Sequence, residues 1–486
     1  MATSCRRDII GTLTKFQLSG AYPIVFAILC AISGSCGKAV YIPILSLLTV
    51  SIVFSALFVK DNKVFIPPCF MMYCGLGTDN KQSYNSTKGD VFSSIDQDAW
   101  ICIIILAIII AAALITRFIA DGTFKSALRS RGVAFWGIIF LDVAFLTNGL
   151  FFVGWSVFNL LFGLLLAFSL TAFYLLFCSI LNRADGQIVK YVCRCMVLTS
   201  YLVLAQMLIK IIPALATNTL IYYHDATSRL VFDRELFSMS WGITTVVGGI
   251  LILGISAALY LAACEKRPVI YSLSAVAFAS APSLMNTRSS MLVGLLILFV
   301  GAIIVSVWSK NRRINLIFFA SLLFAVALAI TATCVYLNSH GLLSRFLDEL
   351  WLLARFDAYK DRLDLLIIGA QHFTQNPVFG VGILTGTSSG GIAVNNIFGN
   401  MYHNIPMQFA ASMGCVGIAA FMFHIKDLFA VGAKKPDVGR ILLLLTPVAI
   451  ILLSLVDNFF FYPNFHIFYT VFLVLAEKDL KTKRTV

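Results

Sequence analysis

Charged residues are scarce in this sequence of 486 residues: Asp, Glu, Lys and Arg together make up 12% of it, whereas 59% of the residues are hydrophobic. In soluble globular domains roughly a quarter of the residues are charged. The deficit therefore excludes a soluble domain, and the mean hydropathy of +0.91 indicates a protein embedded in a lipid bilayer. We predict an all-α polytopic membrane protein, with a single integral membrane domain over residues 1–486.

Cysteine is absent from three long polar stretches at 77–99, 217–240 and 337–401, although the chain has 12 cysteines. A disulfide framework would need cysteines in parts of the chain outside the membrane. The sequence also has no CxxC pair that would indicate a metal or redox site. We therefore predict neither disulfide-linked loops nor a metal centre, and no cofactor.

Apolar runs of the length needed to cross a bilayer, roughly 20 residues each, fill most of the chain. The range 64–76 is short and contains Pro67 and Pro68, so a count of about twelve spans is open beside one of about fourteen. The candidate spans are 20–36, 40–59, 64–76, 100–117, 133–152, 156–180, 191–214, 241–263, 268–285, 290–308, 314–336, 402–424, 441–456 and 458–477.

Basic residues are distributed unevenly between alternate loops. If the N-terminus is cytoplasmic, most of the 36 Lys and Arg residues fall on the inner side, as the positive-inside rule requires. This orientation puts both termini in the cytoplasm and the stretches 77–99, 217–240 and 337–401 outside an inner (plasma) membrane. The net charge of +13 is then a topology signal, and no nucleic-acid partner is implied because the chain has no soluble basic domain.

The outer loop at 337–401 contains an amphipathic helix. From Ser344 to Phe373 apolar residues recur at helical spacing, and Asn376-Pro377 ends the pattern because the residue before proline is pushed out of the helical region. Arg355, Tyr359 and Arg362 recur at the same spacing and form a basic and aromatic stripe. Acidic residues lie among them, so a solvated helix with local ion pairs is the alternative interpretation.

Two further sets of polar residues lie at expected membrane boundaries. Arg288 stands in the short turn between two apolar runs, where an arginine either snorkels to the interface or binds an anion. His403 and Asn404 immediately precede another apolar run, and a histidine there is able to exchange protons near neutral pH. The glycines between these sets would either cradle a phosphate or simply allow turns; they are Gly380, Gly382, Gly386, Gly390 and Gly391.

Three segments, in this order, resemble the O-antigen ligase and polymerase superfamily. They read TRSSMLVGLLILFVG, DRLDLLIIGAQHFTQNPVFGVG and YHNIPMQFAASMGCVGIAAF. The resemblance covers roughly Asn286 to Phe421, and the N-terminal half fits only by topology. One departure is that the turn reads RSS where the family has an RG pair, so the close backbone approach that glycine allows is in doubt.

The resemblance implies a GT-C-like membrane glycosyltransferase that takes a glycan from a polyprenyl (undecaprenyl) diphosphate carrier at the outer face. Carried over by position, the catalytic residues are Arg288, Arg362 and His403, and His403 would be either the base for the acceptor hydroxyl or a ligand of the diphosphate. Arg355 joins the two arginines in binding diphosphate. Fixed arginines suit this chemistry because they neutralise the charge that develops on the leaving group, and we predict metal-independent transfer. Further candidates for substrate binding are Tyr359, Asn404, Lys210 and Arg229.

The acceptor is not indicated by any residue. A polymerase would use another lipid-linked repeat unit, and a ligase would use lipid A core or another envelope acceptor; we favour the polymerase because the outer helix and loop are long enough to hold two lipid-linked substrates. A flippase or transporter is the alternative from another class, which would need charges inside the membrane. Such charges are few: the candidates are Asp142, Lys210 and Asp457, and we expect Asp457 at an outer turn.

Overall fold

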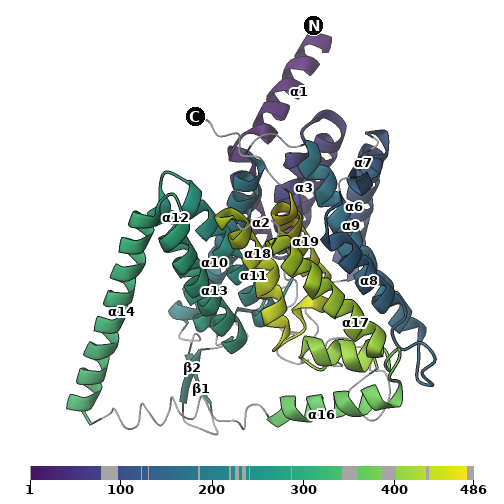
Figure 1. Ribbon diagram of the computed structural model, residues 1–486. Helices are drawn as coiled ribbons and strands as arrows, with labels where there is room; N and C mark the ends of the chain where they lie inside the picture. The colour runs from purple at the N-terminus through teal and green to yellow at the C-terminus, as the bar shows by residue number, and fades with distance from the viewer. Residues whose placement is uncertain are drawn as a thin grey trace.

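The computed structural model is a bundle of helices with both termini at one end (Figure 1). It describes residues 2–77, 97–121, 123–129, 131–183, 187–217, 221–224, 229–232, 237–239, 241–285, 287–341, 360–385, 401–433 and 437–478. The protein is all-α and polytopic, as the composition predicted. In the described ranges, eight helices are long and apolar enough to cross a membrane, or nine if the bent pair at the N-terminus is one span.

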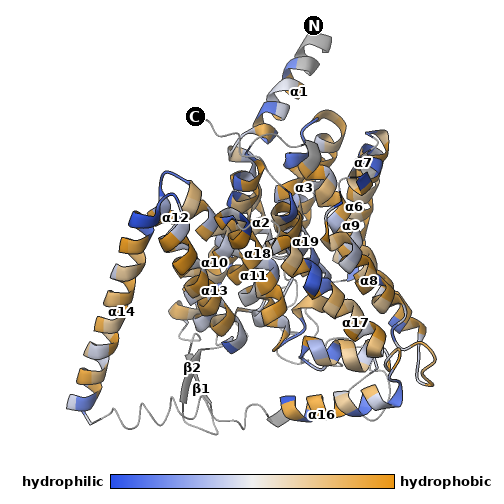
Figure 2. Cartoon of the chain, in the orientation of Figure 1, coloured by the Kyte–Doolittle hydropathy of each residue, from blue (hydrophilic) through white to orange (hydrophobic). Residues whose placement is uncertain are grey.

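The helices alternate in direction along the bundle (Figure 1). In Figure 2 hydrophobic residues dominate their lengths, and hydrophilic residues lie toward the helix ends. The α-helices are α1 Ala2–Leu18, α2 Ala21–Gly34, α3 Lys38–Phe58, α4 Ile66–Met71, α6 Gln97–Ala120, α7 Thr123–Arg129, α8 Ala134–Leu146, α9 Val157–Arg183, α10 Ile188–Ala216, α11 Thr244–Cys264, α12 Pro268–Leu284, α13 Arg288–Trp308, α14 Arg312–Ser339, α16 Lys360–Gln375, α17 Ile405–Ala433, α18 Val438–Ser454 and α19 Pro463–Glu477.

Each predicted span overlaps a helix, although the helix over 402–424 is broken at Gly414, and the span predicted at 64–76 is not continuous. That stretch is divided into 3₁₀-helix η1 Asn62–Phe65, α4 and 3₁₀-helix η2 Met72–Gly75, so the prediction of one continuous span there was wrong. Pro67 and Pro68 lie in the first turn of α4, where they lack the N–H groups that a longer helix would need. The three short helices still run along the bundle, because Gly77, which follows them, packs against Cys36 just after the C-terminal end of α2.

Helix α11 is the centre of the bundle, and it is packed against α10, α12, α13 and α18. In the 18-residue apolar stretch of this helix, 94% of the residues are buried inside the protein. Small residues permit this position because they let neighbouring helices approach closely: a side chain at Gly254 would overlap Ser200 of α10, and one at Gly249 would overlap Phe459. The sequence of α11, which contains no charged residue, is suited to burial on all sides.

The elements expected outside the membrane gather at the end opposite the termini (Figure 1). There α16 lies across the bundle, and a hairpin of β1 Ile221–His224 and β2 Arg229–Phe232 pairs antiparallel with Tyr222 opposite Val231. The sequence did not predict this hairpin. In the 337–401 stretch, α14 extends to Ser339 and α16 ends at Gln375, directly before the predicted stop at Asn376-Pro377.

Candidate active site

The turn between α18 and α19, residues Leu455–Asn458, receives polar side chains from two other elements. Arg362 of α16 donates to the carbonyl oxygen of Val456. Asn404 donates through Nδ2 to the carbonyl oxygen of Leu455 at 3.1 Å, and His403 Nδ1 lies 3.1 Å from Asp457 Oδ1. The structure thus brings Arg362, His403 and Asn404 together on one short turn, although they come from segments well apart in the sequence.

The backbone at His403 and Asn404 explains why these side chains face the turn. His403 has φ of 50°, in the left-handed region that non-glycine residues rarely occupy. Asn404 precedes the first residue of α17, and its Oδ1 accepts from the N–H of Met407 at 3.1 Å, which is an N-cap. Because the cap fixes Asn404 and the strained φ turns His403 away from the helix axis, both reach the 455–458 turn. Such strain is typical of functional sites.

Asp457 is the acidic partner of His403; the sequence analysis expected it at an outer turn but did not assign it to the site. Its side chain is 9% exposed, against 33% for His403, and its Oδ1 also accepts from the N–H of Asn458 at 2.8 Å. A buried carboxylate on Nδ1 fixes the orientation of an imidazole and stabilises its protonated form. The pairing had no local signal because the two residues are far apart in the chain.

Helix α16 is held against the start of α17 by His372 and Tyr402. His372 Nδ1 is hydrogen-bonded to the Tyr402 hydroxyl, and burial lowers the pKa of His372. The Tyr402 N–H donates to Gln408 Oε1 at 3.0 Å. A Cβ at Gly369 would lie 2.5 Å from the Met407 side chain, so the two elements pack closely at this crossing. His372 therefore positions the helix that carries Arg362.

The segment after α16 is inserted into a break in α17 at Gly414, which has φ of 62°. The N–H of Cys415 donates to Pro377 O at 2.8 Å, and the N–H of Gly382 donates to Ser412 O at 3.1 Å. Asn159 of α9 accepts from the N–H of Leu384 at 2.7 Å. These bonds use backbone groups that a phosphate would need, so this part of the glycine-rich stretch is a packing element.

The role of Gly380 is testable by substitution with alanine. Gly380 has φ of +68°, and a Cβ there would lie 2.2 Å from the carbonyl carbon of Ser412. We expect Gly380→Ala to destabilise the protein by about 2–5 kcal/mol, from left-handed strain plus overlap, and to lower its thermal unfolding midpoint in detergent. The matched control is Gly341→Ala, since Gly341 has φ of +67° with no atom within 4 Å of its Cβ position. Equal losses in both variants would contradict the role of packing.

The other glycines of that stretch, Gly386, Gly390 and Gly391, lie outside the described residues. So do Arg355 and Tyr359. Arg229 is in β2, opposite His224 of β1, in a hairpin whose side chains are not described.

Arg288 is exposed at the first turn of α13, and α13 packs against both α11 and α18. A side chain at Gly248 of α11 would lie 2.9 Å from Ser290 Oγ, and one at Gly249 would lie 2.5 Å from Phe459. Glycine on α11 therefore allows α13 and the segment at Phe459 to pack closely against it.

Lys210 of α10 donates to the carbonyl oxygen of Ser238, in the segment that leads into α11. Nearby, Trp241 Nε1 donates to Gln206 Oε1 of the same helix at 3.2 Å. Both contacts tie the end of the 217–240 loop to α10. Lys210 thus lies with the loop before α11.

A family model described as O-antigen ligase matches residues 273–422. The match confirms the resemblance to the O-antigen ligase and polymerase superfamily, and it indicates a family of enzymes that transfer glycans. It includes Arg288, Arg362, His403 and Asn404, whereas Lys210 and Asp457 lie outside it. A comparison with curated proteins finds no match.

Proposed function

We propose that the protein transfers a glycan from a polyprenyl diphosphate carrier to a lipid-linked repeat unit at the outer face of the inner membrane, and so polymerises a surface polysaccharide. The observation that carries this proposal is the convergence of Arg362 and the His403–Asp457 pair on one turn. A cation for the leaving group and a base for the acceptor are the two groups that such a transfer needs.

The transfer forms one bond and breaks another. The acceptor hydroxyl oxygen attacks the anomeric carbon, and the bond between that carbon and the diphosphate oxygen breaks. The hydroxyl proton passes to His403: with Nδ1 directed at Asp457, the neutral imidazole accepts the proton at Nε2. Asp457 then stabilises the imidazolium. The polyprenyl diphosphate leaves with the bonding electrons, and its added charge is neutralised by arginine.

Helix α13 offers a path for the polyprenyl chain. Arg288 begins the helix, and Leu292, Leu295 and Phe299 follow it at helical spacing with 69%, 50% and 60% of their surfaces exposed. A diphosphate held by Arg288 at the membrane boundary would thus place its isoprenoid chain against an apolar face of the same helix. This arrangement supports Arg288 as a diphosphate ligand beside Arg362.

The transport alternative finds less support in the contacts of its candidate charges. Asp457 is paired with His403 at the end of the bundle. Lys210 donates to Ser238 O in a loop, and Asp142 of α8 accepts a hydrogen bond from Thr171 of α9. Two of the three charges therefore belong to the end where the predicted outer loops gather, which favours chemistry at the interface over a path through the bilayer.

The proposed function is tested with purified protein and a lipid-linked repeat unit. We expect a ladder of products that grows by one repeat at a time, read on a gel. A single shifted product that appears only with a lipid A core acceptor would instead identify a ligase. A parallel reaction contains EDTA, because the sequence has two aspartates separated by one residue, Asp96 and Asp98, in the 77–99 stretch, a spacing that can bind a metal ion. We expect full activity with the chelator, and its loss would overturn metal-independent transfer.

A further inference from the structure

The turn between α8 and α9, residues 147–156, projects from the bundle beyond the end of α8 (Figure 1). The middle of the turn is apolar and faces outward: Phe151 is 83% exposed, and Val153 is fully exposed. Phe151 has φ of 65°, a left-handed value that is rare for an aromatic residue. Leu150 and Trp155 are exposed beside them. Such a surface is unfavourable in water, because apolar area is stabilised by its removal from water.

The turn lies in a stretch of the chain that has no charge. No Asp, Glu, Lys or Arg occurs in residues 143–182, which include the turn. Neighbouring turns at the same end of the bundle, by contrast, carry Arg288 and Asp457. Charged residues are rare within the hydrocarbon of a bilayer because they are costly there. The turn therefore has the composition of a membrane segment, although its backbone is not helical.

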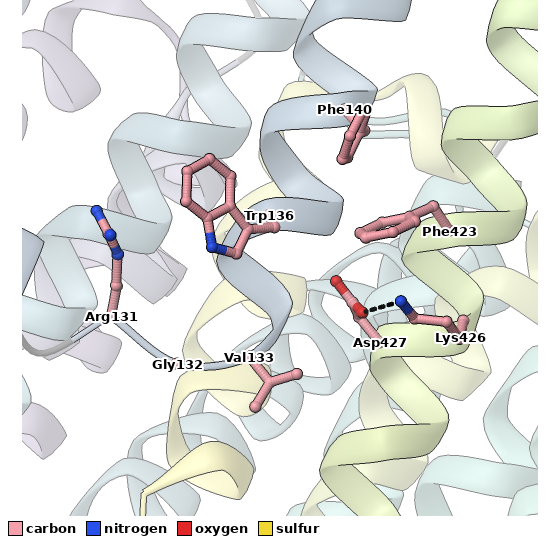
Figure 3. A pocket seen from close by; sticks show the side chains of 8 residues that line it. All are labelled: Arg131, Gly132, Val133, Trp136, Phe140, Phe423, Lys426 and Asp427. Atoms are coloured by element: carbon pink, nitrogen blue, oxygen red, sulfur yellow. Dashed lines mark ion pairs between the residues drawn. The ribbon is translucent and has the colours of Figure 1, made fainter.

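The lengths of α8 and α9 place the turn within the thickness of a bilayer. Figure 3 shows Arg131 and Lys426 beside the start of α8, and these charges mark the membrane boundary on the side of the termini. From there the 13 residues of α8 reach about 20 Å. On α9, Tyr174 accepts from the N–H of Gly132 at the same boundary, and Val157 at the start of α9 lies about 26 Å farther along. Both ends of the turn therefore lie within a hydrocarbon core of roughly 30 Å, and any tilt of the helices brings them closer to that boundary.

A non-helical turn at this depth needs hydrogen-bond partners from the protein, because lipid chains offer none. The turn finds them in the segment that follows α16. The N–H of Gly149 donates to Phe379 O at 2.8 Å. Asn148 Oδ1 accepts from the N–H of Ile383 at 3.0 Å, and the Asn148 carbonyl accepts from Trp155 Nε1 at 3.2 Å. The turn thus has the kind of internal bonding that irregular backbone requires inside a membrane.

We propose that residues 150–155 form a membrane-inserted tip, immersed in the acyl chains of the leaflet opposite the termini. The tip continues the exposed apolar side of α8, where Val143 and Leu146 are 45% and 40% exposed. Immersion removes Phe151 and Val153 from water. The occupant of this surface is lipid, because both ends of the turn lie within the hydrocarbon and a soluble partner would have to enter the bilayer to reach it.

The tip also anchors the segment that follows α16. The ring of Phe151 meets that of Phe379 edge-on, with the centroids 5.7 Å apart, and Asn376 Nδ2 donates to Leu150 O at 3.0 Å. Asn376 comes directly after Gln375, the last residue of α16. The inserted tip therefore holds this end of α16 close to the membrane surface.

The test is the rate at which a membrane-impermeant thiosulfonate modifies an introduced cysteine in the full chain, reconstituted in lipid nanodiscs. We expect Val153→Cys to react at least about tenfold more slowly than His340→Cys, because the reactive thiolate does not form in hydrocarbon. His340 is the matched control, since it is exposed after the 28 residues of α14, which at about 42 Å extend past the hydrocarbon. Mass spectrometry of the peptide with the introduced cysteine keeps the native cysteines out of the measurement.

Equal rates at the two positions in nanodiscs would overturn the proposal. The protein itself does not shield position 153, because Val153 is fully exposed. After unfolding in denaturant the two cysteines should react at the same rate, which shows that the difference comes from the bilayer.

A second measurement identifies what covers the tip. Phe151→p-benzoylphenylalanine is irradiated in native membranes, and we expect its adducts to be phospholipids. A cross-link to a protein instead, or to a second copy of this chain, would show that the tip is an interface with that partner and would overturn immersion in lipid. Neither measurement depends on glycan transfer.

Discussion

Replacement of Arg362 by alanine is expected to reduce glycan transfer about a hundredfold to a thousandfold, the cost of removing one group that stabilises developing charge. Arg362 lies in the first turn of α16 and donates a hydrogen bond to the 455–458 turn. His403 contacts the same turn through Asp457. The measurement is the initial rate of chain extension with purified variant and lipid-linked repeat unit. Lys38→Ala is the control, because Lys38 is another exposed cation at the start of a helix, outside the candidate site.

The contact with the Val456 carbonyl raises a structural alternative, in which Arg362 only holds α16 in place. Arg362→Gln separates the two roles, since glutamine keeps a donor for that carbonyl but has no charge. We expect the glutamine variant to be as impaired as the alanine variant, with an unchanged unfolding midpoint. Arg362→Lys keeps the charge but not the planar fork, so its rate should lie between those of the unmodified protein and the alanine variant. Normal transfer by the glutamine variant would refute the catalytic role.

Replacement of His403 by alanine is expected to lower the transfer rate about a hundredfold to ten-thousandfold, the contribution of a general base. Asp457→Asn should lose part of that factor, because asparagine keeps the geometry near Nδ1 but does not stabilise the imidazolium. Single-turnover rates with preformed enzyme and donor complex measure this step. His340→Ala is the control, since His340 is exposed at the end of α14 and bonds only locally to Tyr336 and Ser339 in the described part of the chain.

The double variant tests whether Asp457 acts through His403. If it does, His403→Ala/Asp457→Asn should be no slower than His403→Ala alone, because the carboxylate has no base left to support. Additive losses would show instead that Asp457 contributes independently, for example by fixing the 455–458 turn through Asn458. An unchanged rate in His403→Ala would remove the histidine from the mechanism.

The sequence predicted the helices well because the bilayer imposes a length and an apolar composition that are visible in any single segment. It failed at 64–76, where apolar composition persists but two adjacent prolines prevent one continuous helix. It also missed the hairpin at 221–232, whose strands of four residues each carry too little periodicity to be distinguished from a polar loop.

For the site, the sequence named Arg288, Arg362, His403 and Asn404, and the structure places the last three on one turn. The sequence left the role of the glycines open, since glycine serves tight packing and phosphate binding equally well. Because Gly380 and Gly382 contact α17 closely, glycine at these two positions serves packing. The partnership of His403 with Asp457, and that of His372 with Tyr402, could not be predicted because each joins residues from distant parts of the chain.

The sequence by itself determined that this is a helical membrane protein with a resemblance to the O-antigen ligase and polymerase superfamily, because hydropathy and short motifs are properties of local segments. Only the tertiary structure decided which polar residues act together. Side chains far apart in the chain meet at the 455–458 turn for three reasons. Helix α16 packs closely against the start of α17 at Gly369, and α17 is broken at Gly414. The N-cap at Asn404 fixes the residues before α17, which include His403. These are packing constraints between elements, and no single segment contains them.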